Sequence, residues 1–216
     1  MFAYRGDAWG RNYVSEAGLL ASATQAEMAA GLMAGTQIAT QIGWRDVAAV
    51  AVGDQVMTFD GGMQAVAAVT RQMLTTDGEM AREEEWLVFV PAGALGNRND
   101  MTLLPQQAVM IEADAAEEAF GDPFAMIPAS ALVGFRQITR VPPADQIEIV
   151  TLVFAQDQVI FAQGGALLFC QESHELIDAA LSDYRILDVQ TAHLLVNTMI
   201  CDDLAASAAP LCKVAA

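Results

Sequence analysis

The part of the chain that most constrains its fold is residues 35–62, where strand-like runs alternate with glycine-containing turn signals. Residues 36–42 alternate in polarity, which is typical of a half-buried strand, and residues 55–59 form a second such run. Gly53 can adopt a positive φ angle, and Asp54 can cap the turn around it. The turn signals are Gly43-Trp44, Val52-Gly53-Asp54 and Asp60-Gly61-Gly62. This pattern predicts a mainly β fold of short strands joined by tight turns.

The same segment resembles the Hint superfamily, the fold shared by hedgehog autoprocessing domains and inteins, and in particular the compact Hint-domain proteins of alphaproteobacteria. The family usually reads Cys-Phe-x-x-Gly-Thr-x-Ile-x-Thr, then Gly-Trp, a Val, and Val-Gly-Asp-x-Val. Its leading cysteine is the nucleophile, whereas this chain has Gly31 at that position. The matching positions are Gly35, Thr36, Ile38, Thr40, Gly43, Trp44, Val47, Val52, Gly53, Asp54 and Val56.

A second family block resembles residues 90–110, and it too differs at the reactive positions. The block normally ends in Ser-Pro-x-His, whose hydroxyl and imidazole polarise the scissile amide and help to protonate its nitrogen. Leu104 stands here at the hydroxyl position and Gln107 at the histidine position. Leucine donates no hydrogen bond, and the glutamine amide does not titrate near neutral pH. The resemblance therefore implies that these catalytic groups have been replaced.

A third block, residues 126–163, resembles the closing strands of the family. The family often has His-x-Val-Ile there, followed by Ala-Glu-Gly. This chain has Asp157 in place of the histidine and Gln163 in place of the glutamate. An ordinary aspartate is ionised at neutral pH, so Asp157 cannot replace a histidine as proton donor.

We divide the chain into three parts. Residues 1–30 form an N-terminal extension, residues 31–172 a degenerate Hint-like β domain, and residues 173–216 a helical C-terminal segment. Within the domain, a short helix is expected at residues 114–120. The expected fold class is thus mainly β, of the Hint (hedgehog/intein) type, with a helical C-terminus and an N-terminal extension.

The composition fits a soluble chain. Its 216 residues suit one compact domain plus an extension, and polar residues interrupt each apolar stretch well before the roughly 18 residues of a membrane span. No signal-peptide pattern is visible, so a cytoplasmic location is expected. The net charge of −17 opposes binding to nucleic-acid phosphates and to anionic membranes, and it leaves basic protein surfaces as partners.

The remaining chemistry-bearing residues favour structural roles. Cys170 and His174 lie four positions apart, which on a helix places both on one face, but no third residue is identifiable that would orient such a pair. None of the three cysteines has metal-binding spacing. The carboxylates of residues 83–85 and 112–118 lack the alternating oxygen ligands of a calcium loop, so we expect solvated faces. We therefore expect neither a metal nor a cofactor.

Aromatic residues gather in the first part of the chain, at Phe2, Tyr4, Trp9 and Tyr13. Trp and Tyr are favoured at protein interfaces because they bury much area and keep a polar group. These four residues are our candidates for contact with a protein partner. The alternative is that the segment folds back onto its own domain.

The sequence thus predicts a catalytically inactive Hint-fold protein that serves as a structural or interaction subunit of a larger protein assembly. Two alternatives stay open. An autoprocessing Hint domain would need a nucleophile at residue 31, where glycine supplies no side chain. A binding module would hold a peptide or small ligand in the former active-site cleft without catalysis.

Overall fold

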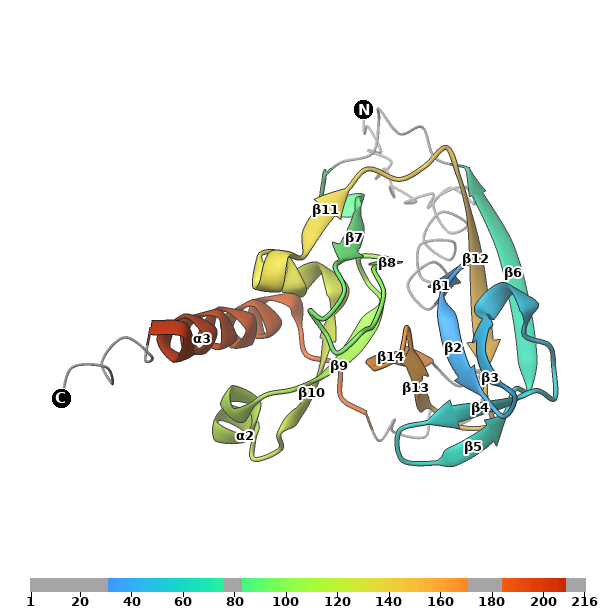
Figure 1. Cartoon of the computed structure of the whole chain (residues 1–216), viewed down its shortest axis with the longest axis horizontal. Helices are drawn as coiled ribbons and strands as arrows, with labels where there is room; N and C mark the ends of the chain where they lie inside the picture. Colours follow the sequence, from blue (N-terminus) through green and yellow to red (C-terminus); the bar gives the residue numbers. More distant parts are fainter. Residues whose placement is uncertain (1–30, 76–82, 171–183, 209–216) are drawn as a thin grey trace, which may run out of the picture.

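The computed structural model describes residues 31–75, 83–170 and 184–208. These residues form a mainly β structure whose C-terminal part is helical, which confirms the expected fold class (Figure 1). The four N-terminal aromatic candidates, Phe2, Tyr4, Trp9 and Tyr13, lie outside the described residues, as does His174.

The largest sheet joins strands from both halves of the domain. Its order is β10-β9-β14-β13-β2-β4-β5, and β3 pairs with β2. Strands β13 and β14 therefore lie between strands from the beginning and from the middle of the chain. The bounds are β2 (Gln37–Thr40), β3 (Gly43–Asp46), β4 (Gln55–Thr58), β5 (Gly62–Ala65), β9 (Ala108–Glu112), β10 (Phe124–Pro128), β13 (Gln158–Ala162) and β14 (Ala166–Cys170).

Two three-stranded sheets border position 31. The first has the order β1-β12-β6 and the second has the order β11-β7-β8. Strand β1 lies at an edge of the first sheet and strand β8 at an edge of the second, and the two strands contact each other. The bounds are β1 (Leu32–Met33), β6 (Ala68–Thr75), β7 (Leu87–Val90), β8 (Met101–Leu103), β11 (Thr139–Val141) and β12 (Gln146–Val153).

The predicted strands of residues 36–42 and 55–59 are found as β2 and β4. The turn between β3 and β4 also forms as predicted, because Gly53 has a φ angle of +88°. The Asp54 carboxylate accepts a hydrogen bond from the main-chain N–H of Ala51 at 2.9 Å. That bond lowers the pKa of Asp54 from its ordinary value.

The prediction of a turn at Gly43-Trp44 is wrong by two residues. The turn consists of Gln41 and Ile42, and Gly43 begins β3, which pairs with β2 through Gly43 opposite Thr40. Gly43 has a φ angle of +103°, which glycine adopts at little cost. Gly43 therefore does mark a reversal of the chain direction, but it is the first residue of the strand after the turn.

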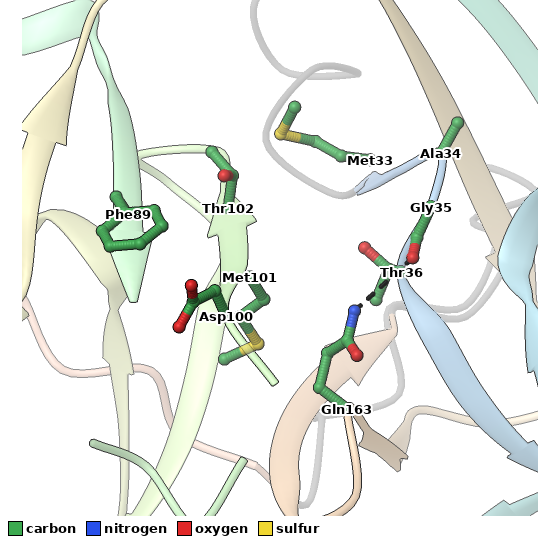
Figure 2. A pocket seen from close by; sticks show the side chains of 9 residues that line it. All are labelled: Met33, Ala34, Gly35, Thr36, Phe89, Asp100, Met101, Thr102 and Gln163. Carbon is green, nitrogen blue, oxygen red and sulfur yellow. Dashed lines mark hydrogen bonds between the residues drawn. The ribbon is translucent and has the colours of Figure 1, made fainter. Parts of the chain in front are cut away.

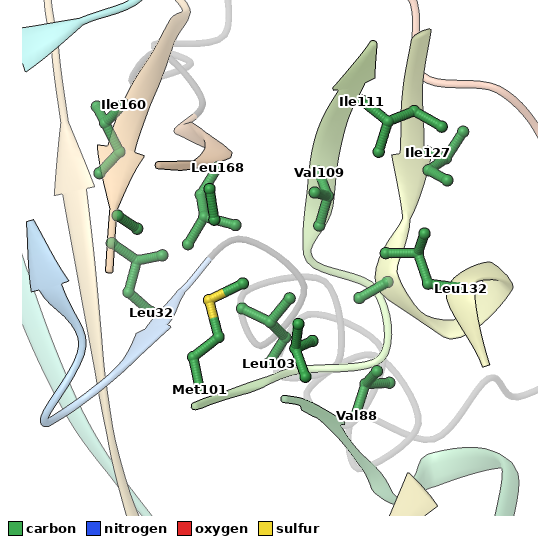
Figure 3. Packing of buried hydrophobic residues seen from close by; sticks show 14 of the residues in the cluster. Leu32, Val88, Met101, Leu103, Val109, Ile111, Ile127, Leu132, Ile160 and Leu168 are labelled. Atoms are coloured by element: carbon green, nitrogen blue, oxygen red, sulfur yellow. The ribbon is translucent and has the colours of Figure 1, made fainter. Parts of the chain in front are cut away.

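A continuous apolar core holds the sheets together (Figure 3). Val109, Ile160 and Leu168 of the large sheet have no exposed surface, and Leu32 of β1 and Leu103 of β8 are also buried in it. Burial of one such side chain contributes about 1.5–3 kcal/mol. This packing sets the position of β1 and hence of Gly31, which directly precedes it.

The α-helices lie on the side of the molecule away from β6 (Figure 1). Helix α2 (Asp114–Phe120) has the predicted bounds and ends at Gly121, whose φ angle is +78°. Four 3₁₀ helices complete the described elements. They are η1 (Val47–Ala49), η2 (Glu83–Glu85), η3 (Ala129–Leu132) and η4 (Phe135–Gln137).

Helix α3 (Val189–Ala208) is the helical part of the described C-terminal residues. Asp188 caps it, since its carboxylate accepts the main-chain N–H of Gln190 and of Thr191, each at 3.0 Å. A further bond from the Thr191 hydroxyl lowers the pKa of Asp188. Arg136 of η4 forms a salt bridge with Asp203 of α3 at 2.8 Å. Within the described residues, α3 included, no helix combines the length and apolarity needed to cross a membrane.

Candidate functional site

Gly31 lies buried at the start of β1, where the packing leaves no space for a side chain. Strand β1 pairs with β12, with Leu32 opposite Val150 and Met33 opposite Ile149. A Cβ atom added to Gly31 would overlap the Cγ2 methyl of Ile149. The volume that a nucleophilic side chain would need at position 31 is therefore filled by an apolar residue of β12.

Leu104 packs into the same apolar surroundings. Its side chain is 3% exposed and belongs to a cluster with Leu87, Ile147 and Ile149. Ile149 thus belongs to the same apolar cluster as Leu104 and also fills the space beside Gly31. The structure brings these two predicted positions together, but around a methyl group and not around a polar one.

Gln107 is 1% exposed and acts as a cross-link between strands. Its side-chain Nε2 donates to the carbonyl oxygen of Phe169 in β14 at 2.9 Å, and to that of Ala108 in β9 at 3.0 Å. Strands β9 and β14 pair nearby through Leu168 opposite Val109. The amide therefore extends the contact between the two strands. Its Oε1 accepts no hydrogen bond from the described residues.

Asp157 lies half-buried in the turn between β12 and β13. The carbonyl oxygen of Phe169, which accepts the hydrogen bond from Gln107, belongs to β14. Phe169 lies opposite Val159 of β13, and Val159 follows Asp157 by two residues. Three of the predicted positions are linked. The main-chain N–H of Gln107 donates to the carbonyl oxygen of Leu104 at 3.0 Å, and Ile149 fills the space beside Gly31 and belongs to the same cluster as Leu104. Asp157 directly precedes β13.

A cavity of about 240 Å³ opens between the edge strands β1 and β8 (Figure 2). Met33, Phe89 and Met101 supply apolar surface, while Asp100 and Gln163 add polar groups. The lining residues are Met33, Ala34, Gly35, Thr36, Phe89, Asp100, Met101, Thr102 and Gln163. The sequence alone does not predict this cavity, since its walls come from four separate segments that only the fold brings together.

Gln163, at the position of the family's glutamate, holds the base of the cavity in place. Its main-chain N–H donates to the carbonyl oxygen of Gln37 at 2.7 Å, and its carbonyl accepts the N–H of Arg98 at 2.6 Å. The side-chain Nε2 lies 3.5 Å from the carbonyl oxygen of Gly35 (Figure 2). The φ angle of Gln163 is +46°, which is unusual for a residue other than glycine. Such backbone geometry is found where the surroundings over-determine the conformation.

The comparison with known protein families identifies this arrangement. The sequence profile described as the Hint domain matches residues 30–168, more than half of the chain and all strands from β1 to β13. This chain belongs to the Hint domain family. Among curated proteins, no sequence matches it.

Several solved structures resemble this Hint domain. A bacterial intein-like domain from Clostridium thermocellum is 12% identical, with a TM-score of 0.47, and the match covers 65% of this chain and 98% of that one. The MchDnaB-1 intein (N145AA) is 14% identical, with a TM-score of 0.42 and coverage of 66% and 99%. The Msm DnaB1 intein splicing domain bound with zinc is 19% identical, with a TM-score of 0.38 and coverage of 65% and 99%.

Cys170 and the carboxylates of residues 83–85 and 112–118, the other chemistry-bearing residues of this Hint domain, do not form a reactive centre in the described residues. Burial raises the pKa of Cys170 to about 12, so its thiol is protonated at neutral pH and is a poor nucleophile. The acidic residues 83–85 and the carboxylates of residues 112–118 are exposed, as predicted for solvated faces. Nowhere in the described part of the chain do three His, Cys, Asp or Glu side chains gather as a metal site requires.

Proposed function

We propose that this Hint-fold protein is catalytically inactive and serves in the cytoplasm as a structural or interaction subunit of a larger protein assembly. The observation that carries the proposal is the packing at position 31. Glycine has no nucleophilic group, and the Ile149 methyl occupies the space where such a group would extend. Acyl transfer in this family begins with a side-chain nucleophile, so the first step has no reactant here.

The groups that would assist a nucleophile are replaced as well. Leu104 sits in an apolar cluster, and its side chain can neither donate nor accept a hydrogen bond. Gln107 uses its amide to bind two main-chain carbonyls, and it has no proton to transfer near neutral pH. These side chains are integrated into the packing. Filled space at Gly31 and Leu104 and a bonded Nε2 at Gln107 are typical of a scaffold kept for stability, while the Oε1 of Gln107 has no donor among the described residues.

Mass spectrometry of the purified chain tests the loss of catalysis. We expect an intact mass of 23.0 kDa after incubation with excess thiol. A self-cleaving intein treated in the same way is the positive control. A break before Gly31 would overturn the proposal and restore the autoprocessing alternative.

Native purification of the tagged chain from its own cells tests the role as a subunit. We expect a protein partner in fixed stoichiometry. The net charge of −17 favours a partner with a basic surface, so raised salt should weaken the complex. Recovery of the chain alone under low-salt conditions would contradict this part of the proposal.

The cavity between β1 and β8 supports a second candidate function, a binding module without catalysis. The sulfur atoms of Met33 and Met101 and the ring of Phe89 suit an apolar side chain of an extended peptide. Native mass spectrometry should then detect a bound molecule on the purified chain. Ala34→Arg, which places a long cation in the exposed wall of the cavity, should remove it, whereas Ile42→Arg on the exposed β2–β3 turn should not. A wild-type chain without added mass would count against this candidate.

A further inference from the structure

Helix α3 has two opposite faces, and the domain covers one of them. Ala192, Leu195 and Val196 on the covered face are buried against the domain. On the other face, Leu194 is 70% exposed and Leu204 is 65% exposed. Singly exposed apolar side chains are normal, so it is the position of these two on one uncovered face of the same helix that makes the face a candidate contact surface.

The exposed face forms a stripe with regular spacing. Its residues follow one another at intervals of four, three, four and three, the spacing of the a and d positions of a coiled coil. We call this set the outer stripe, which consists of Gln190, Leu194, Asn197, Cys201 and Leu204. The stripe carries no charge, although the chain has a net charge of −17. Residues 190–207 contain two carboxylates, Asp202 and Asp203, and neither belongs to the stripe.

Asn197 indicates what covers the stripe. If a purely apolar partner covered it, the amide would lose its hydrogen bonds to water and gain none, which is unfavourable. If a second copy of α3 lies parallel and in register, Asn197 meets Asn197, and one amide donates to the other. The same register places Leu194, Cys201 and Leu204 opposite their own counterparts. Because the stripe is uncharged, it is also a surface through which two copies of this acidic chain can meet without close like-charge pairs.

We propose that the outer stripe of α3 pairs with the outer stripe of a second copy of this chain in a short parallel coiled coil. The inference rests on the proposed function, since it names one contact surface of the subunit. The shape of the molecule permits the pairing. Helix α3 points away from the sheets (Figure 1), and each domain packs on the face of its own helix that is turned away from the stripe.

The pairing is weak because the helix is short. Twenty residues span about 30 Å, which gives an interface at or below about 1,200 Å². Such an interface dissociates at low protein concentration. The equilibrium between one and two copies should therefore fall within about 1–500 μM, the range that sedimentation equilibrium can measure.

Sedimentation equilibrium of the purified full-length chain under reducing conditions tests the proposal. We expect the wild type to shift from monomer to dimer as its concentration rises. Leu194→Asp with Leu204→Asp should shift the dissociation constant at least about tenfold towards monomer. The matched control is Ile42→Asp with Ala206→Asp, which adds the same two charges at exposed positions off the stripe and should leave the equilibrium unchanged. Circular dichroism should show that both variants remain folded.

A disulfide test reports the register. In a Cys212→Ser background, mild oxidation should join two chains through Cys201, which is exposed, whereas Cys170 is buried. The stripe variant should not form this product. A wild-type monomer throughout the concentration range, or equal weakening by the stripe and control variants, would overturn the pairing. Neither result bears on the loss of catalysis, which the intact-mass measurement tests separately.

Discussion

Replacement of Gly31 by alanine tests whether the core has closed over position 31. The φ angle of Gly31 lies outside the left-handed region, so the backbone accepts a side chain and only the lack of space opposes one. The new methyl group would overlap Cγ2 of Ile149, which is 1% exposed and packed among Leu87, Leu104 and Ile147. Overpacking of this kind costs about 1–3 kcal/mol. In a chain of this length, each kcal/mol lowers Tm by about 2–4 °C.

Two substitutions at Ile149 separate this overlap from general damage to the core. Ile149→Val keeps the Cγ2 methyl and removes only Cδ1, so its cost should add to that of Gly31→Ala within about 0.5 kcal/mol. Ile149→Ala removes Cγ2 and alone costs about 2–5 kcal/mol. The methyl group at position 31 then enters the vacated space. The double variant should be more stable than the sum of the single effects by about 0.5–3 kcal/mol.

Urea denaturation followed by tryptophan fluorescence measures all five variants against the wild type. The expected result is a coupling free energy with Ile149→Ala and none with Ile149→Val. The reasoning would be refuted if Gly31→Ala changed the free energy of unfolding by less than about 0.5 kcal/mol. It would also be refuted if both cycles were additive, since the methyl group would then not be the obstacle.

Three further predictions concern side chains elsewhere in the domain. Gln107→Leu removes the Nε2 donor that two main-chain carbonyls share and should lower the free energy of unfolding by about 1–3 kcal/mol in urea denaturation. Unchanged stability would contradict the cross-link. Burial raises the pKa of Cys170 to about 12, whereas Cys201 is exposed. Iodoacetamide at about pH 8 and low protein concentration should therefore modify Cys201 and spare Cys170, which peptide mass spectrometry can measure. Equal labelling of the two thiols would refute this. The hydrogen bond from Arg136 lowers the pKa of Asp203, so the pair stabilises the fold above the unfolded-state pKa of about 3.9 and stops doing so as the pH falls through the folded-state value. Asp203→Asn should therefore lower Tm at about pH 7 but not at about pH 2, and an equal decrease at both would count against the pair.

Much of the fold could be predicted from local sequence pattern. The alternation of residues 36–42 became β2, and Gly53 took the positive φ angle that its turn required. Helix α2 has the predicted bounds, because its apolar spacing and Gly121 are local signals that act within a few residues. The misplaced turn at Gly43 shows the limit of such signals. Glycine marks a reversal, but its register depends on which strand it pairs with.

For the candidate site, too, the sequence determines one part and the tertiary structure the other. The sequence alone determined which residues stand at the reactive positions of the Hint pattern, since Gly31, Leu104 and Gln107 can be read off once the spaced blocks are aligned. The tertiary structure alone decided what surrounds them. Ile149 lies 118 positions from Gly31 along the chain (149 − 31), and only the pairing of β1 with β12 brings its methyl group there.

The cavity and the outer stripe depend on tertiary structure for the same physical reason. The walls of the cavity come from β1, β7, β8 and the β13–β14 turn, which no local pattern connects. The spacing of the outer stripe is visible in the sequence, but its exposure is not, because periodicity cannot tell which face of a helix the domain will cover. Local side-chain chemistry sets what each segment can form. Long-range packing sets which of its surfaces remain open to a partner.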